Sequence, residues 1–203
     1  MNLEREILEA YLKANGFLVR QTGQINLSSL KKKQQPLPTF AVFNPMTEKN
    51  SDALGYRLYT SDLQGVRSAL VSLLGWENTA FSNAQLHSDS GLLKFFKNEA
   101  NEEKIHSGYN PLPSLVESGM GSFLRLLVVP TLPKSDLKLK QSFNFFKEKG
   151  VDGILTLSSI LENLLKQVVP TDSYAYNRVF QFLKLLKAYD LVREPQLEMF
   201  KEE

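Results

Sequence analysis

The sequence contains no cysteine among its 203 residues. This absence excludes a disulfide framework, a zinc site built from thiolates and a cysteine nucleophile. The sequence also lacks any apolar run that approaches the roughly 18–20 residues of a membrane-spanning helix. Its first six residues are charged and helical in pattern, unlike a secretory signal. A cysteine-free chain without an export signal fits the cytoplasm best, so we expect a cytoplasmic protein without a membrane partner.

An excess of charge of one sign is missing as well. Lysine and arginine number 24 and aspartate and glutamate 22, which leaves a net charge of only +2. Basic and acidic blocks alternate along the chain, so the overall charge does not by itself indicate a nucleic-acid or membrane partner. Hydrophobic residues (42%) and charged residues (23%) are present in globular proportions, which excludes a disordered or fibrous protein. We expect one domain over residues 1–190 and an acidic, partly mobile tail over residues 191–203.

Apolar periodicity and turn signals predict both helices and strands. Helices are expected over residues 3–15, 62–75, from 88 or 89 to 96, 135–149, 160–168 and from 172 or 173 to 186. Strands are expected over residues 17–19, 39–43, 56–60, 123–129 and 154–157. Residues 21–37 and 100–121 are rich in polar residues, glycine and proline, and are predicted to be irregular.

The order of these elements predicts the sheet. Residues 123–129 are apolar apart from Arg125, as in a strand that is buried on both faces. A helix separates them from residues 154–157, so the two strands are predicted to be parallel neighbours. No helix separates the strands expected at 17–19, 39–43 and 56–60, and these are predicted to be antiparallel. The fold class is therefore α/β, with a mixed central sheet flanked by helices.

Short chemical motifs are scarce. The two histidines, His87 and His106, are nineteen residues apart with no acidic cluster beside either, so surface positions are the expected interpretation. The glycines form no phosphate-binding loop between a strand and a helix. Lys31, Lys32 and Lys33 form a basic run in a polar loop, where lysines can contact phosphates, although such a run is more often simply solvated.

The element order resembles that of the restriction-endonuclease-like fold of the PD-(D/E)xK nuclease superfamily, in particular of prokaryotic members. The similarity is clearest at the two ends of the chain. Residues 3–20 read Leu-Glu-Arg-Glu-Ile-Leu-Glu-Ala-Tyr-Leu-Lys-Ala-Asn-Gly-Phe-Leu-Val-Arg, like the opening helix and first strand of that fold. Residues 127–130, Leu-Val-Val-Pro, together with residues 145–165 resemble its closing half.

The resemblance implies an aspartate on the second core strand and a Glu-x-Lys or Asp-x-Lys on the third, which hold a magnesium ion and position a water molecule. The second expected strand, residues 39–43, has no acid, and the third, residues 56–60, has neither acid nor lysine. Glu4 or Glu6 could match an acid that some members carry on the first helix. Asp52 and Asp62 flank the third expected strand. The motif is therefore interpreted as degenerate.

Three functions stay open on the sequence. The first is a nuclease-fold protein that has lost metal-dependent catalysis and acts as a nucleic-acid-binding or accessory domain without a cofactor. Any nucleic acid would bind weakly and salt-sensitively through Arg20, Lys31, Lys32 and Lys33. The second is a non-enzymatic protein-interaction module, with a protein partner or as a homodimer. The third is an active endonuclease that uses magnesium and recruits Glu4, Asp52 and Asp62.

Overall fold

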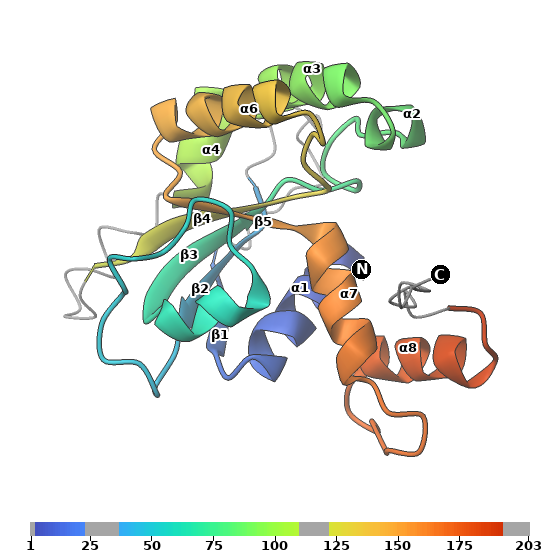
Figure 1. Ribbon diagram of the computed structural model, residues 1–203. Coiled ribbons are helices and arrows are strands. Elements are labelled where there is room, and N and C mark those ends of the chain that lie inside the picture. The colour runs from blue at the N-terminus through green and yellow to red at the C-terminus, as the bar shows by residue number, and fades with distance from the viewer. Residues whose placement is uncertain (1–2, 23–36, 110–121, 193–203) are drawn as a thin grey trace, which may run out of the picture.

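A computed structural model describes residues 3–22, 37–109 and 122–192 of the chain (Figure 1). Within them, five strands form one sheet in the order β1-β2-β3-β4-β5. Strands β1 and β2 pair antiparallel, as do β2 and β3, whereas β3, β4 and β5 are mutually parallel. Only β2 therefore runs against the other four strands. The strands are Leu18–Thr22, Thr39–Phe43, Ser68–Leu73, Leu124–Val129 and Gly153–Thr156.

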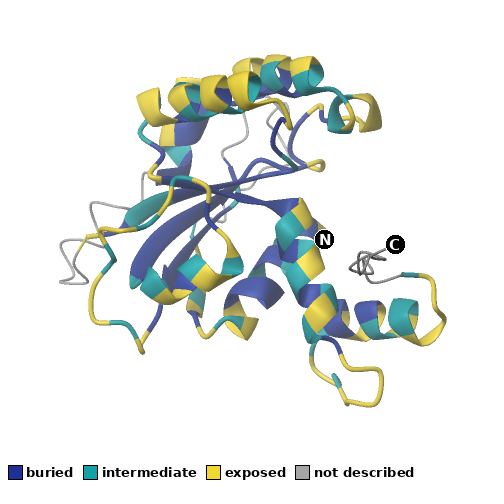
Figure 2. Cartoon of the chain, in the orientation of Figure 1, coloured by how far each residue is buried: buried dark blue, intermediate teal, exposed yellow. Residues whose placement is uncertain are grey.

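Helices cover both faces of the sheet, and the strands between them are largely buried (Figure 2). One layer contains α1, α7 and α8, and the other contains α3, α4 and α6 (Figure 1). The bounds of these six helices are Leu3–Ala14, Leu157–Gln167, Arg178–Ala188, Asp89–Glu99, Glu102–Tyr109 and Asp136–Glu148. The short α2 (Asn83–Leu86) and a 3-10 helix, η3 (Thr60–Gly65), lie in the connections.

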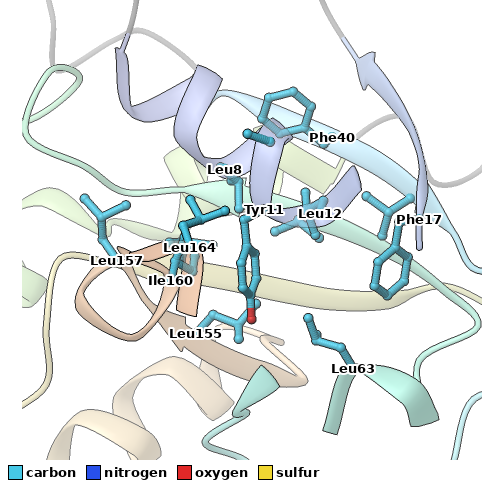
Figure 3. Packing of buried hydrophobic residues seen from close by; sticks show 14 of the residues in the cluster. Leu8, Tyr11, Leu12, Phe17, Phe40, Leu63, Leu155, Leu157, Ile160 and Leu164 are labelled. Atoms are coloured by element: carbon cyan, nitrogen blue, oxygen red, sulfur yellow. The ribbon is translucent and has the colours of Figure 1, made fainter. Parts of the chain in front are cut away.

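Each helical layer has its own apolar core. On the α1 side, Leu8, Tyr11 and Leu12 pack with Ile160 and Leu164 of α7 (Figure 3). On the other side, a set of aromatic rings joins α3 and α6 to the sheet, and its fully buried members include Phe95, Phe96 and Phe146. Alternate residues of each strand feed the two cores, since successive side chains of a strand point to opposite faces. The two cores fix the sheet between its helices.

The expected α/β class and mixed sheet are confirmed. Strand β2 has the predicted bounds, and β4 lies inside the sheet, parallel to β5. The first helix ends where expected, at Gly16, whose φ of 85° is the left-handed conformation that glycine adopts readily at a helix end. The predicted antiparallel pairing of the first two strands is also confirmed. The third member of the predicted set, residues 56–60, is not the strand that pairs with β2; that strand is β3, which is antiparallel to it.

The predicted strand 56–60 and the predicted helix 62–75 are both wrong. Residues 56–60 contribute only an isolated bridge from Arg57 to Ile154 at the edge of β5, and η3 follows. Within the predicted helix, residues 68–73 form β3, and all six are buried. A strand buried on both faces lacks the alternation of apolar and polar residues, so its apolar spacing also matched a helix.

Other boundaries also differ from the predictions. Residues 102–109, expected to be irregular, form α4, while residues 110–121 lie outside the described part. Helix α7 begins three residues early because the Thr156 hydroxyl accepts a hydrogen bond from Ser159 N and caps it. Helix α8 begins later than expected, after the cap residue Asn177. In the expected loop 21–37, residues 21 and 22 extend β1, and residues 23–36, like the tail 193–203, are outside the described part.

Across the three described ranges, no helix is both long enough and apolar enough to cross a lipid bilayer.

Candidate functional site

Strands β2 and β3, on which the resemblance implies the acids and the lysine, carry none of these residues. The corrected third strand reads Ser-Ala-Leu-Val-Ser-Leu, and the second reads Thr-Phe-Ala-Val-Phe. In their antiparallel pairing, Thr39 lies opposite Ser72. The two strands therefore bring together a pair of hydroxyl groups on the face that packs against α4, and no carboxylate.

The Thr39 and Ser72 hydroxyls form a closed, buried pair. Their oxygens are 2.8 Å apart, and Thr39 Oγ1 also donates to the carbonyl of Leu37 at 3.0 Å. Because a hydroxyl has one proton, Ser72 must donate to Thr39. Both side chains are buried, so each hydroxyl uses its proton within the protein. Two neutral hydroxyls with these partners do not provide the anionic ligands that a magnesium ion prefers.

Helix α4 covers this pair closely. A Cβ atom on Gly108 would lie 2.7 Å from Ser72 Oγ and 3.1 Å from Thr39 Oγ1, so only glycine fits at this crossing. The adjacent Tyr109 donates its hydroxyl proton to the carbonyl of Leu126 at 3.1 Å. Burial raises the pKa of Tyr109 far above its usual range, which keeps the phenol protonated as a donor. Helix α4 thus covers the hydroxyl pair of Thr39 and Ser72.

Glu4 is the one candidate acid that is buried, and it is fully engaged. Its side chain extends from the first turn of α1 to the turn that follows β3, where its two oxygens accept hydrogen bonds from Trp76 N and Glu77 N, both at 2.9 Å. Burial raises the pKa of Glu4, although these two hydrogen bonds oppose the shift. A Cβ atom on Gly75 would overlap the carboxylate. Glu4 therefore clamps α1 to the sheet.

The structure does not bring the other candidate acids to Glu4. Asp62 lies in η3, where its carboxylate accepts a hydrogen bond from Tyr59 N at 2.7 Å. Asp52 is exposed in a turn after β2. Glu6 lines a cavity of about 190 Å³ between α1 and the start of α8. Among the described residues, no three histidine or acidic side chains gather closely enough to hold a metal ion.

Of the expected nucleic-acid contacts, only Arg20 can be located. It is exposed on β1, an edge strand of the sheet, and it lines a largely apolar cavity of about 190 Å³ together with Leu18, Phe43 and Phe123. Lys31, Lys32 and Lys33 lie outside the described residues. Arg20 is therefore a single cation beside an apolar hollow, which is insufficient for a phosphate-binding surface.

No family model matches the chain, and neither the curated proteins nor the solved structures contain a match to it. Its function is therefore inferred from the geometry described above and from the surface of the molecule.

The sequence alone did not identify Thr39, Ser72 and Gly108, the residues that meet where α4 crosses β2 and β3. Thr39 and Ser72 are polar residues in strands that are otherwise mostly apolar, and this contrast is a usable signal. Gly108 gives no such signal, because its need for a small side chain arises only when α4 crosses the strands. The clamp joins Glu4 to Trp76 and Glu77, which lie 72 and 73 positions later in the sequence.

The clamp predicts a measurable loss of stability. We expect Glu4→Gln to lower the free energy of unfolding by about 1–3 kcal/mol, because the amide nitrogen of glutamine would face a backbone N–H and leave that donor unpaired. Urea denaturation measures this loss. Glu6→Gln, on the same helix but only half-buried, is the matched control and should stay within about 0.5 kcal/mol of the unchanged chain.

The difference in stability between the unchanged chain and Glu4→Gln is expected to depend on pH. Since the pKa of Glu4 is raised in the native state, native Glu4 holds its proton above the ordinary pKa of 4.5, where the unfolded chain has lost it. The stability that Glu4 confers is therefore greatest below this value and falls as the pH rises through the raised pKa. The difference between the unchanged chain and Glu4→Gln should narrow as the pH rises above 4.5 and through the raised pKa. A widening difference would contradict this assignment.

Proposed function

We propose that the chain is a restriction-endonuclease-like domain that has lost metal-dependent catalysis and acts in nucleic-acid binding or as an accessory subunit. One observation carries the proposal: the facing polar side chains of β2 and β3 are Thr39 and Ser72, hydrogen-bonded to one another beneath Gly108 of α4. On these two strands the resemblance implies carboxylates and a lysine.

The order of elements supports the fold part of the proposal. A helix, three antiparallel strands, a helical connection, a fourth strand, a helix, a fifth strand and two closing helices follow one another along the chain. This is the order on which the resemblance rests, with β3 now in the third place.

The loss of catalysis follows from the number of available carboxylates. Hydrolysis assisted by magnesium needs at least two carboxylates converging on an ion, because one acid neither fixes the coordination geometry nor activates the bound water sufficiently. Glu4 is a single acid, and both of its oxygens accept backbone hydrogen bonds. The carboxylate of Asp62 already accepts a hydrogen bond from Tyr59 N at the start of η3.

We expect no nicking of supercoiled plasmid by the purified chain with either Mg²⁺ or Mn²⁺, beyond that of a sample containing EDTA. Glu4→Ala and Asp52→Ala serve as controls, since a contaminating nuclease would act equally in all three preparations. Nicking by the unchanged chain that disappears in either variant would contradict the proposal and favour an active endonuclease.

The binding half of the proposal is tested separately by a mobility shift with duplex DNA. We expect a complex at low salt that dissociates as salt is added, because affinity would come from phosphate neutralisation. Failure to bind duplex at low salt would overturn a nucleic-acid role and leave the accessory role.

A protein-interaction module is the second candidate, and one observation favours it. Helix α8 exposes Phe182 and Leu185, and its C-cap residue Tyr189 is exposed as well; the spacing of three and four residues puts them on one side of the helix. Exposed apolar side chains grouped in this way are a feature of protein-binding surfaces. This candidate predicts no affinity for duplex DNA, so the mobility shift discriminates between the two functions.

A further inference from the structure

Helices α3 and α6 lie side by side on the outside of the molecule (Figure 1). They run in the same direction, since the carboxylate of Asp89 at the start of α3 accepts hydrogen bonds from Lys134 N and Ser135 N, just before α6, at 3.0 and 2.8 Å. Further along, the rings of Phe96 and Phe146 stack edge to face, 5.0 Å apart. These two contacts set the register of the helices. Along the common direction of the two axes, each residue of α3 lies beside the residue of α6 that follows it by about 45–50 positions in the sequence.

This register brings exposed lysines together. Lys94 and Lys97 lie one turn apart on α3, and Lys140 of α6 is nearly level with Lys94. All three are exposed. The side of both helices that faces away from the sheet is formed mainly of exposed residues (Figure 2). Lys94, Lys97 and Lys140 together are called the lysine face.

The lysines of the lysine face are not held in ion pairs. In the described part of the chain, none of its three lysines forms an ion pair. The exposed acids of α6, Asp136 and Glu148, lie in its first and last turns, and the acid at the end of α3, Glu99, is buried against Lys104. Between the first turn and the last residue of each helix, the exposed charged side chains are therefore lysines. Four more lysines flank them, namely Lys134, Lys138, Lys147 and Lys149.

We propose that the lysine face binds the phosphate backbone of duplex nucleic acid. This inference rests on the proposed function and assigns it to a surface distinct from Arg20 and β1. Lysine contributes a point charge that neutralises phosphate without reading base edges, so binding through this face is independent of sequence. Counterion release from the duplex supplies the affinity and makes it dependent on salt.

The composition of the face favours a duplex over the other anionic partners. Single strands are bound by exposed aromatic side chains that stack on the bases. The aromatic rings of α3 and α6 are turned inward: Phe95, Phe96 and Phe146 are buried, and Phe143 and Phe145 are half-buried. A helix that lies in a membrane surface needs an apolar side to insert, whereas Leu137 is the only large apolar side chain exposed on these two helices.

The test compares two variants with equal loss of charge by fluorescence anisotropy on a labelled duplex. The first, K94Q/K97Q/K140Q, removes the lysine face. The second, K13Q/K49Q/K166Q, removes exposed lysines of α1, the loop after β2 and α7. Glutamine retains the helix propensity of lysine. We expect the first variant to bind at least about 30-fold more weakly at low salt, with a salt slope shallower by roughly 2.7, since three phosphate contacts are lost.

The control variant should bind within about threefold of the unchanged chain, and K94R/K97R/K140R should retain its affinity because the charge is kept. If the unchanged chain binds duplex and K94Q/K97Q/K140Q loses no more affinity than the control, the assignment of the surface fails while the proposed function stands. If the unchanged chain binds no duplex, the assignment of the surface and the nucleic-acid role both fail, and the accessory role is left. Binding to phosphatidylserine vesicles that needs the three lysines, without duplex binding, would overturn the proposal in favour of a lipid surface.

Discussion

Replacing Phe146 by alanine is expected to lower the free energy of unfolding by about 3–5 kcal/mol, the range observed when a buried phenylalanine is truncated. Phe146 is 0% exposed. Its ring meets Phe96 edge to face at 5.0 Å and Phe145 at 5.3 Å. Truncation removes these contacts and leaves a cavity between α3, α6 and the sheet, and the surrounding rings cannot collapse into it without losing their own packing.

Phe145→Ala is the control for Phe146→Ala, because Phe145 is the neighbouring ring in sequence but is only half-buried. It should reduce the stability by less than half as much, since less apolar surface returns to water. Guanidinium denaturation followed by circular dichroism measures both. Equal losses would mean that the core between α3 and α6 is not packed as described, and would also undermine the common register of Lys94 and Lys140.

How far the fold can be predicted from the sequence is best seen in β3 and β4. Residues 124–129 were recognisable as a strand because six apolar or long side chains end abruptly at Pro130. Residues 68–73 are all buried, yet Leu70 and Leu73, together with Val66 before them, also fit the spacing of a helix face. Only pairing with β2 and β4, on either side, decides between the two, and that pairing is not local.

The candidate site also has features that the sequence predicts and features that only the folded structure shows. That β2 and β3 hold no carboxylate can be read from the sequence once the strands are located. The hydrogen-bonded pair of Thr39 and Ser72 beneath α4 cannot be read from the sequence. The two hydroxyls are 33 positions apart, and their cover depends on Gly108, in a segment that was expected to be irregular. Likewise, the spacing of Lys94 and Lys97 is local, but their proximity to Lys140 follows from the packing of α3 on α6.

Removing one partner of the buried ion pair between Glu99 and Lys104 is expected to have a second large effect on stability. The side chains are only 7% and 3% exposed, and Glu99 Oε2 lies 3.5 Å from Lys104 Nζ. The ammonium also donates to the carbonyl of Asn78 at 3.2 Å, and the side chain of Asn78 accepts a hydrogen bond from Gly75 N. Lys104 therefore connects α4 to the turn that Glu4 holds from the other side.

We expect Glu99→Ala to lower the free energy of unfolding by about 3–5 kcal/mol at neutral pH, because it leaves a buried ammonium without its counter-charge. The double variant E99L/K104M removes both charges and keeps an apolar volume, so it should be markedly more stable than Glu99→Ala and close to the unchanged chain. Urea denaturation of the three proteins measures these differences. A double variant as unstable as Glu99→Ala would show that lost packing, and not the unpaired charge, is responsible.

The pH dependence of Glu99→Ala separates charge from packing in a second way. Burial lowers the pKa of Lys104, and Glu99 opposes that shift, so the pKa falls further when Glu99 is removed. Between this lowered pKa and the ordinary lysine value of 10.5, the unfolded chain holds a proton that the native protein has released. Stability therefore rises with pH in that window, and more so in the variant. The deficit of Glu99→Ala should shrink from about pH 7 to about pH 10, and a constant deficit would contradict a charged Lys104 in the native protein at neutral pH.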